Sequence, residues 1–126
     1  SGSKKQDMHN FKELKIWQDS RKFCKSIYEI TKQFPDAEKF GLTNQIRRSV
    51  VSVPSNIAEG SGRGSDKEFS KFINYSIGSS YELETQLLIA FDLEFMTESD
   101  LNLLLEELIK IQKMLNKFND YLKNKS

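Results

Sequence analysis

Apolar residues recur along this chain with the spacing of α-helices. Between residues 11 and 34 they return every three or four positions, and a second apolar stripe runs beside the first. The first stripe consists of Ile16, Ser20, Phe23, Ile27, Ile30 and Phe34. Pro35 follows the pattern, so we predict a first helix from about Phe11 to Thr31.

The next apolar series predicts a second helix that contains a proline. It consists of Leu42, Ile46, Val50, Val53 and Ile57. Asp36 precedes the series and is the expected N-cap. Pro54 lies inside the series, and its ring removes a backbone donor, so we expect a kink or an early end there.

The third helix is predicted to begin at a capping box. In the segment from Ser65 to Glu68, the serine hydroxyl can accept a hydrogen bond from the glutamate amide. The periodic pattern then continues to about Phe91. Gly78 lies inside it and costs roughly 1 kcal/mol relative to alanine. We expect a closely packed helix beside Gly78 as the structural compensation.

The fourth helix carries the most regular apolar seam of the chain. Thr97 is its expected N-cap. The seam steps by three and four residues through Leu101, Leu104, Leu108, Ile111, Leu115, Phe118 and Leu122. Four helices joined by short turns predict an all-α fold, an antiparallel up-down-up-down four-helix bundle. We expect one domain over residues 4–126, with residues 1–3 as the remnant of an expression tag.

The helices carry more apolar surface than a monomeric bundle buries. The first helix has two apolar stripes, and the fourth has Leu103, Leu105 and Ile109 outside its seam. Surplus apolar surface of this kind indicates a subunit interface. We therefore expect the chain to assemble with itself.

A glycine-containing stretch, SVPSNIAEGSGRGSDKEF, separates the second helix from the third. A phosphate-binding loop needs a strand before it and a lysine followed by serine or threonine after it, and neither is present. We expect a corner in which Gly60 adopts the left-handed conformation that ends a helix. Arg63 projects from this corner, and Lys67 and Lys71 share its face if the helical path extends back that far. These three cations form either an anion site at a helix N-terminus or a solvated charged face.

Charge is balanced over the whole chain but not along the predicted bundle. The net charge is +1, so no overall basic excess points to nucleic acid. The end that holds Arg63 gathers 12 basic and 6 acidic residues, and the other end holds the remaining 7 basic and 12 acidic residues. Lys113 and Lys117 belong to the basic end, with Lys4 and Lys5. Such an end attracts a polyanion or an acidic partner, although basic chain termini also simply keep proteins soluble.

Several polar residues are candidates for structure and assembly. Arg47 and Arg48 lie among apolar neighbours in the second helix, and Glu82 and Glu84 lie at a similar depth in the third. We expect an ion pair between these groups, inside the bundle or between subunits. Asn56 and Glu59 are expected to satisfy backbone groups around Pro54, with a catalytic carboxylate as the alternative.

The remaining chemistry-bearing residues are few. Cys24 is the single cysteine and His9 the single histidine, so the sequence offers no metal-ligand set and no nucleophilic triad. We expect no enzyme activity, no cofactor and no small-molecule substrate. No apolar run is long enough to span a membrane, and no leader opens the chain, so a cytoplasmic setting is expected.

The chain resembles a known family over nearly its whole length, from about Phe11 to Leu122, and the clearest matches lie in residues 34–87. The pieces that match are Phe34-Pro35, Gly41-Leu42-Thr43, Gln45-Ile46-Arg47-Arg48, Asn56-Ile57-Ala58-Glu59-Gly60 with Arg63, and Gly78-Ser79 followed by Glu82-Leu83-Glu84. Together they resemble the bacterial four-helix bundle family of proteins encoded in 23S ribosomal RNA intervening sequences. That family includes the accessory variability determinant of diversity-generating retroelements. One departure is Ser49, where the family pattern has alanine.

The resemblance implies a homopentamer with a central channel and a role without catalysis. In retroelements the accessory protein binds a reverse transcriptase and its template RNA through a basic surface, whereas this chain is nearly neutral. We therefore expect an oligomeric, nucleic-acid-associated adaptor that binds RNA, DNA or a reverse transcriptase through its basic end. The alternative is a protein-only interaction scaffold of the intervening-sequence type.

Overall fold

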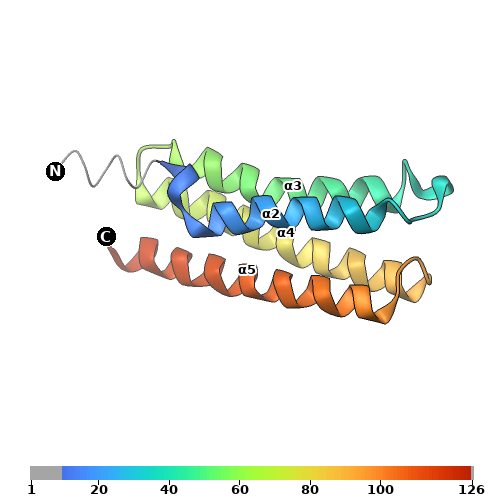
Figure 1. Ribbon diagram of the computed structural model, residues 1–126. Helices are drawn as coiled ribbons and strands as arrows, with labels where there is room; N and C mark the ends of the chain where they lie inside the picture. Colours follow the sequence, from blue (N-terminus) through green and yellow to red (C-terminus); the bar gives the residue numbers. More distant parts are fainter. Residues whose placement is uncertain (1–9, 126) are drawn as a thin grey trace.

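Four long helices account for most of the protein. The computed structural model describes residues 10–125, so residues 1–3, Lys4, Lys5 and His9 lie outside the described residues. The elements are η1 (Phe11–Glu13), α2 (Lys15–Thr31), η2 (Asp36–Glu38), α3 (Leu42–Ser61), α4 (Asp66–Asp92) and α5 (Glu98–Lys125). The long helices alternate in direction (Figure 1), with the α3–α4 corner, the start of α2 and the end of α5 together at one end. The predicted all-α four-helix architecture is confirmed, and residues 10–125 contain no strand.

The predicted seam of the fourth helix forms one side of the core. Leu104, Leu108, Leu115 and Leu122 are buried, and Phe118 is half-buried against the same cluster. Burying one such side chain contributes about 1.5 to 3 kcal/mol. The second apolar stripe of the first helix also packs on this core, through Leu14, Trp17 and Cys24. No helix within residues 10–125 is long and apolar enough to cross a membrane.

The prediction of one continuous first helix from Phe11 was wrong at its start. Leu14 has an extended backbone, with φ −75° and ψ 126°, and it separates η1 from α2. The side chain of Leu14 packs against the core, and Phe11 lies edge-on to Trp17 with ring centroids 5.1 Å apart. The break folds the apolar start of the chain back onto α2.

The predicted N-cap of the second helix was also wrong. Asp36 belongs to η2, and α3 begins only at Leu42. The Glu38 carboxylate accepts a hydrogen bond from the Leu42 amide, at 3.2 Å. A side chain therefore still satisfies a free amide at this helix start, but it comes from the glutamate of the preceding turn.

The early end predicted at Pro54 does not occur, because α3 continues to Ser61. Proline has no amide to donate to the carbonyl four residues earlier, which belongs to Val50. The Cys24 thiol of α2 donates to that carbonyl at 3.5 Å. Asn56 donates its side-chain amide to the Ser52 carbonyl at 2.9 Å, one turn back in α3, and its role at the proline stays a prediction.

Gly60 does not end α3 in a left-handed conformation. It is buried inside the last turn, and a Cβ atom placed on it would lie 2.6 Å from the Cβ of Phe72 and 2.9 Å from Cδ1 of Phe69. Gly60 is thus the point where α4 packs closely against α3. Among the glycines of residues 10–125, the one with positive φ is Gly64, at 87°.

The side-chain caps predicted at Ser65 and Thr97 are confirmed. The Ser65 hydroxyl accepts from the Glu68 amide and the Thr97 hydroxyl from the Asp100 amide, each at 3.1 Å. The neighbour expected at Gly78 is not present in the described chain. Gly78 is exposed, and a Cβ atom on it would have nothing within 4 Å.

Candidate interaction surfaces

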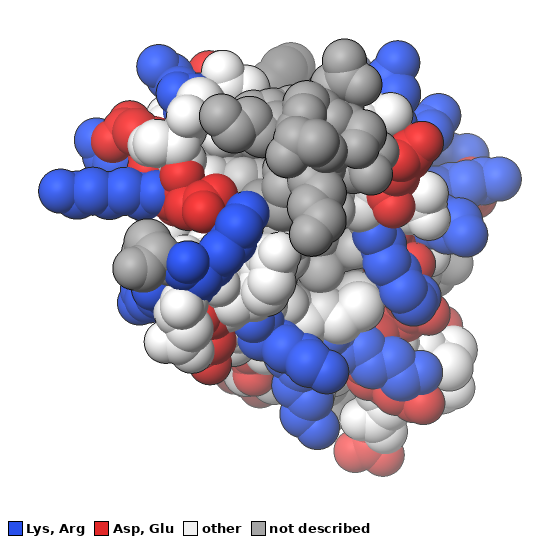
Figure 2. All heavy atoms as spheres, turned by 90° about the vertical axis from the view of Figure 1, so that its left-hand side faces the viewer, with Lys and Arg blue, Asp and Glu red and all other residues white. Residues whose placement is uncertain are grey.

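The end of the bundle that holds the α3–α4 corner is ringed by basic side chains. Figure 2 shows Lys and Arg around this end, with Asp and Glu between them. Two of the lysines are paired with carboxylates: Lys15 with Asp19 at 2.8 Å, and Lys125 with Asp66 at 3.4 Å. The basic end is therefore a mixed surface in which part of the positive charge is locally neutralised.

Arg63 is engaged within the corner. Its guanidinium lies 3.0 Å from the Glu59 carboxylate and 4.7 Å from the ring centroid of Phe72. The condition for a face shared with Lys67 and Lys71 is not met, because α3 ends at Ser61 and α4 begins only at Asp66. The role predicted for Glu59 was wrong, because its carboxylate pairs with Arg63 instead of a backbone group.

Four lysines that the sequence analysis assigned to the basic end are exposed to solvent. Lys67 and Lys71 are exposed one turn apart at the start of α4, and Lys113 and Lys117 are exposed one turn apart on α5. Within residues 10–125, none of these four forms an ion pair with a carboxylate. We call Lys67, Lys71, Lys113 and Lys117 the lysine surface.

The ion pair expected between helix arginines and glutamates does not form inside the bundle. Arg47 instead donates to the Thr31 hydroxyl at 2.9 Å and to the Tyr28 carbonyl at 3.4 Å, and its guanidinium lies 4.5 Å from the Tyr28 ring centroid. Because these are the last residues of α2, Arg47 caps the C-terminus of that helix. Glu84 accepts from the Gln112 side chain of α5 at 2.8 Å.

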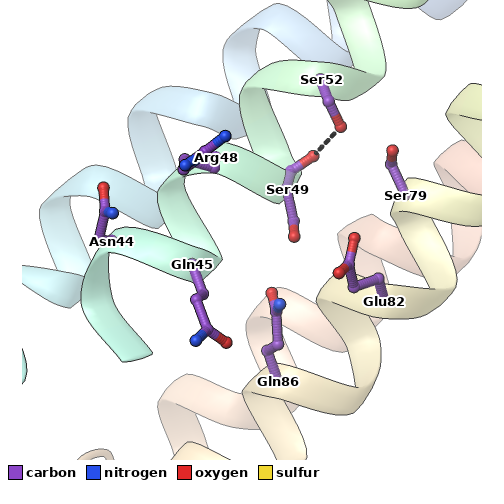
Figure 3. Close-up of a pocket in the computed structure, with 8 residues that line it drawn as sticks. All are labelled: Asn44, Gln45, Arg48, Ser49, Ser52, Ser79, Glu82 and Gln86. Carbon is purple, nitrogen blue, oxygen red and sulfur yellow. Dashed lines mark hydrogen bonds between the residues drawn. The ribbon is translucent and has the colours of Figure 1, made fainter. Parts of the chain in front are cut away.

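Arg48 and Glu82 lie at the mouth of a polar pocket between α3 and α4. The pocket has a volume of about 410 Å³ and is lined by Asn44, Gln45, Arg48, Ser49, Ser52, Ser79, Glu82 and Gln86. In Figure 3 Glu82 and Gln86 point from α4 into the space between the helices, and Arg48 lies on α3 without reaching Glu82. The small side chains Ser49, Ser52 and Ser79 leave this space open.

Gln86 is a pocket residue that the sequence analysis missed. It is 8% exposed, and its Oε1 atom is buried with no hydrogen-bond partner. The residue follows Leu83 and precedes Leu87 in the core stripe of α4, so its burial was readable from the periodicity. What the periodicity does not reveal is that the serines opposite Gln86 are too short to reach its amide.

The profile of the 23S rRNA-intervening sequence protein family matches residues 12–117. The chain belongs to this family. No curated protein sequence matches it.

The matched span contains every element that builds the two surfaces. It reaches from η1 to the last third of α5 and includes the lysine surface, Arg48, Glu82 and Gln86. The family resemblance drawn from the sequence is thereby confirmed. The retroelement accessory role that the resemblance also implied stays a prediction.

Cys24 is held as a neutral thiol. Burial raises the pKa of its side chain from an ordinary value of 9.0 to about 11. A thiol that keeps its proton can donate to the Val50 carbonyl, whereas a thiolate cannot. Among the described residues, no group of three or more His, Cys, Asp or Glu side chains is arranged to hold a metal ion.

Proposed function

We propose that this protein is a non-enzymatic, oligomeric adaptor in the bacterial cytoplasm that binds nucleic acid or a reverse transcriptase through its basic end. The observation that carries the proposal is the lysine surface. Its four exposed ammonium groups have no carboxylate partner among residues 10–125. Such groups can exchange their counterions for phosphates, which favours association with RNA.

Self-association is part of the proposal, with the pentamer that the family resemblance implies. Tyr75, Tyr81 and Ile89 of α4 and Leu103 and Ile109 of α5 are exposed on the outer faces of these helices. Large apolar side chains in these positions support a subunit interface. An assembly with parallel bundles would place several lysine surfaces at one end and strengthen the attraction for a polyanion.

The test is a titration of labelled structured RNA with tag-free protein at about 50 and 200 mM salt. Lys67→Ala combined with Lys71→Ala removes two charges from the lysine surface without touching the core. We expect wild-type binding that weakens steeply with salt, and a smaller salt dependence for the double variant. Each lost phosphate contact lowers the salt slope by roughly 0.7 to 0.9.

A matched control removes the same charge elsewhere. Lys22→Ala combined with Lys25→Ala deletes two exposed lysines from the middle of α2, and these lysines form no ion pair with a described carboxylate. If this control lowers RNA affinity as much as the α4 variant, binding follows overall charge and the proposed surface is wrong. Absence of binding by a well-assembled wild type at the lower salt would refute the nucleic-acid proposal.

A protein-only scaffold is the second candidate, and one observation favours it. At the end opposite the lysine surface, Phe40 is 87% exposed and Leu93 is 53% exposed. The same end carries Asp92, Glu94 and Glu98. An apolar tip with acidic neighbours suits a protein partner. In that case RNA binding is absent, and Phe40→Ser abolishes partner binding.

A further inference from the structure

The pocket between α3 and α4 contains polar groups that the chain itself does not satisfy. Gln86 Oε1 is buried without a hydrogen-bond partner. Arg48 and Glu82 are exposed beside it, and neither forms an ion pair among residues 10–125. A buried acceptor left unpaired costs about 1 to 3 kcal/mol. The site is therefore incomplete and lacks a donor.

A lysine side chain has the chemistry that this pocket lacks. Its ammonium group carries three donors, so one lysine can donate to the Glu82 carboxylate and the Gln86 carbonyl oxygen together. Its flexible aliphatic stem can pass the short Ser79 side chain at the rim (Figure 3). Among residues 10–125 no side chain donates to Gln86 Oε1, so a donor from outside the chain can fill this role.

The register of α4 and α5 indicates which part of α5 could supply this lysine from a second copy. Gln112 of α5 donates to the Glu84 carboxylate at 2.8 Å and to the Ser80 carbonyl at 3.5 Å. The α5 residues near 110–112 therefore lie within about one helical turn of the height of Glu82 along the bundle. In a cyclic assembly whose axis runs along the bundles, rotation preserves this height. Lys110 and Lys113 of one copy then both come level with Glu82 of the next, and Lys110 is the one that lies on the same helix face as the exposed Leu103.

One further pair at a matched height fits the same contact. Leu103, 60% exposed, is two turns from Lys110 and comes level with Ile89, which is 43% exposed. The present partner of Lys110 is Glu106, 3.9 Å away and solvent-exposed, and a pair of that kind is weak enough to be exchanged.

We propose that the α3–α4 pocket binds the Lys110 side chain of a second copy of this chain, with Glu82 and Gln86 accepting hydrogen bonds from its ammonium group. Leu103 of the entering helix packs on Ile89. This inference rests on the self-association in the proposed function and assigns its surface. Lys117 lies nearer the basic end and remains at the edge of the contact.

The test is a charge exchange read by mass in solution. Glu82→Lys and Lys110→Glu are made singly and together, and each protein is examined by sedimentation at several concentrations. We expect the wild type to form a multiple of the 14.6 kDa chain and each single variant to lose at least tenfold in association. The double variant restores the opposite charges and regains assembly. Both sites are exposed, so the helical content of all variants should match the wild type.

Lys25→Glu is the matched control. Lys25 lies on α2 at the height of the pocket, since the adjacent Cys24 contacts Val50, which follows the pocket residue Ser49. This control should assemble like the wild type. Assembly of both single variants at wild-type strength would overturn the inference while leaving RNA binding by the lysine surface intact. A double variant as weak as its singles would also overturn it, and a monomeric wild type would refute self-association itself.

Discussion

Helix α4 packs against both α5 and α3, and the two contacts differ in how well their polar side chains are hydrogen-bonded. Against α5, its buried polar side chains are paired: the Ser70 hydroxyl donates to Asn119 Oδ1 at 2.5 Å, and the Asn119 amide donates to Asn74 Oδ1 at 3.0 Å. Against α3, the Ser76 hydroxyl donates to the Val53 carbonyl at 2.8 Å, but Gln86 Oε1 has no partner. The polar side chains named at the α4–α5 contact thus have hydrogen-bond partners within the chain, whereas Gln86 Oε1 at the α3–α4 contact has none.

The difference is caused by side-chain size at facing positions. On the α5 side, asparagine and glutamine face serine, asparagine and glutamate, and their amides can reach across. On the α3 side, serines and Gly60 bring the backbones close at the corner and leave a hollow near Gln86. Complete polar pairing fixes the register of a helix pair, whereas an open hollow offers a surface to a partner.

The largest expected effect comes from breaking the close approach of α3 and α4. Gly60→Ala places a Cβ atom 2.6 Å from the Cβ of Phe72, a distance that requires a backbone shift. We expect a loss of about 3 kcal/mol in the free energy of unfolding, measured by urea denaturation. Gly78→Ala is the matched control: its Cβ meets nothing within 4 Å, so the gain in helix propensity should raise stability by up to about 1 kcal/mol. Equal effects of the two substitutions would contradict the packing described here.

The second prediction compares the paired and the unpaired amide directly. Asn119→Ala leaves the buried Ser70 hydroxyl without its partner, so we expect a loss of about 2 kcal/mol in the free energy of unfolding. Gln86→Leu removes an amide whose oxygen has no partner, and it should leave the free energy of unfolding of the single chain unchanged or raised. Urea denaturation of both variants at low protein concentration is the measurement. A larger loss for Gln86→Leu than for Asn119→Ala would reverse the comparison.

The helices and their apolar faces could be predicted from the sequence because periodicity records burial. The seam of α5 and the caps at Ser65 and Thr97 follow from local spacing and side-chain chemistry. The left-handed turn was assigned to Gly60 instead of Gly64, because both glycines suit a corner and only the packing of Phe69 and Phe72 separates them. Sequence patterns within one helix or turn do not reveal this contact, because it forms between two helices.

The polar partners were harder to predict because they depend on neighbours that are distant in sequence. Arg47 was expected to pair with a glutamate of the third helix, and it caps α2 instead. Nothing in the spacing of Cys24 indicated that its thiol would meet the carbonyl freed by Pro54, 30 residues later in the chain. Such contacts require the crossing of two helices to be known.

A smaller effect on the free energy of unfolding is expected where α2 crosses α3, at the hydrogen bond from Cys24 to Val50. Cys24→Ala leaves the Val50 carbonyl without the thiol donor and should cost about 1 kcal/mol in the free energy of unfolding near pH 7. Because burial raises the thiol pKa from 9.0 to about 11, the folded protein retains this proton in a range where the unfolded chain releases it. The stability that the thiol contributes is thus fully present below pH 9 and is lost as the pH rises toward about 11. The measurement is the difference in unfolding free energy between wild type and Cys24→Ala across this range, and a difference that grows with pH would contradict the assignment.

The smallest effect on stability is expected at the corner that connects α3 to α4. Glu59→Gln removes the counter-charge of Arg63 from a solvent-exposed pair, so the free energy of unfolding should change by less than about 0.5 kcal/mol. The same change releases the guanidinium from its carboxylate while leaving it beside the Phe72 ring. RNA affinity at low salt should therefore rise, and its salt dependence should become steeper. Arg63→Gln supplies the control, since it removes the cation and should not increase affinity. If Glu59→Gln weakens binding, Arg63 serves the corner alone and the basic end works through its lysines.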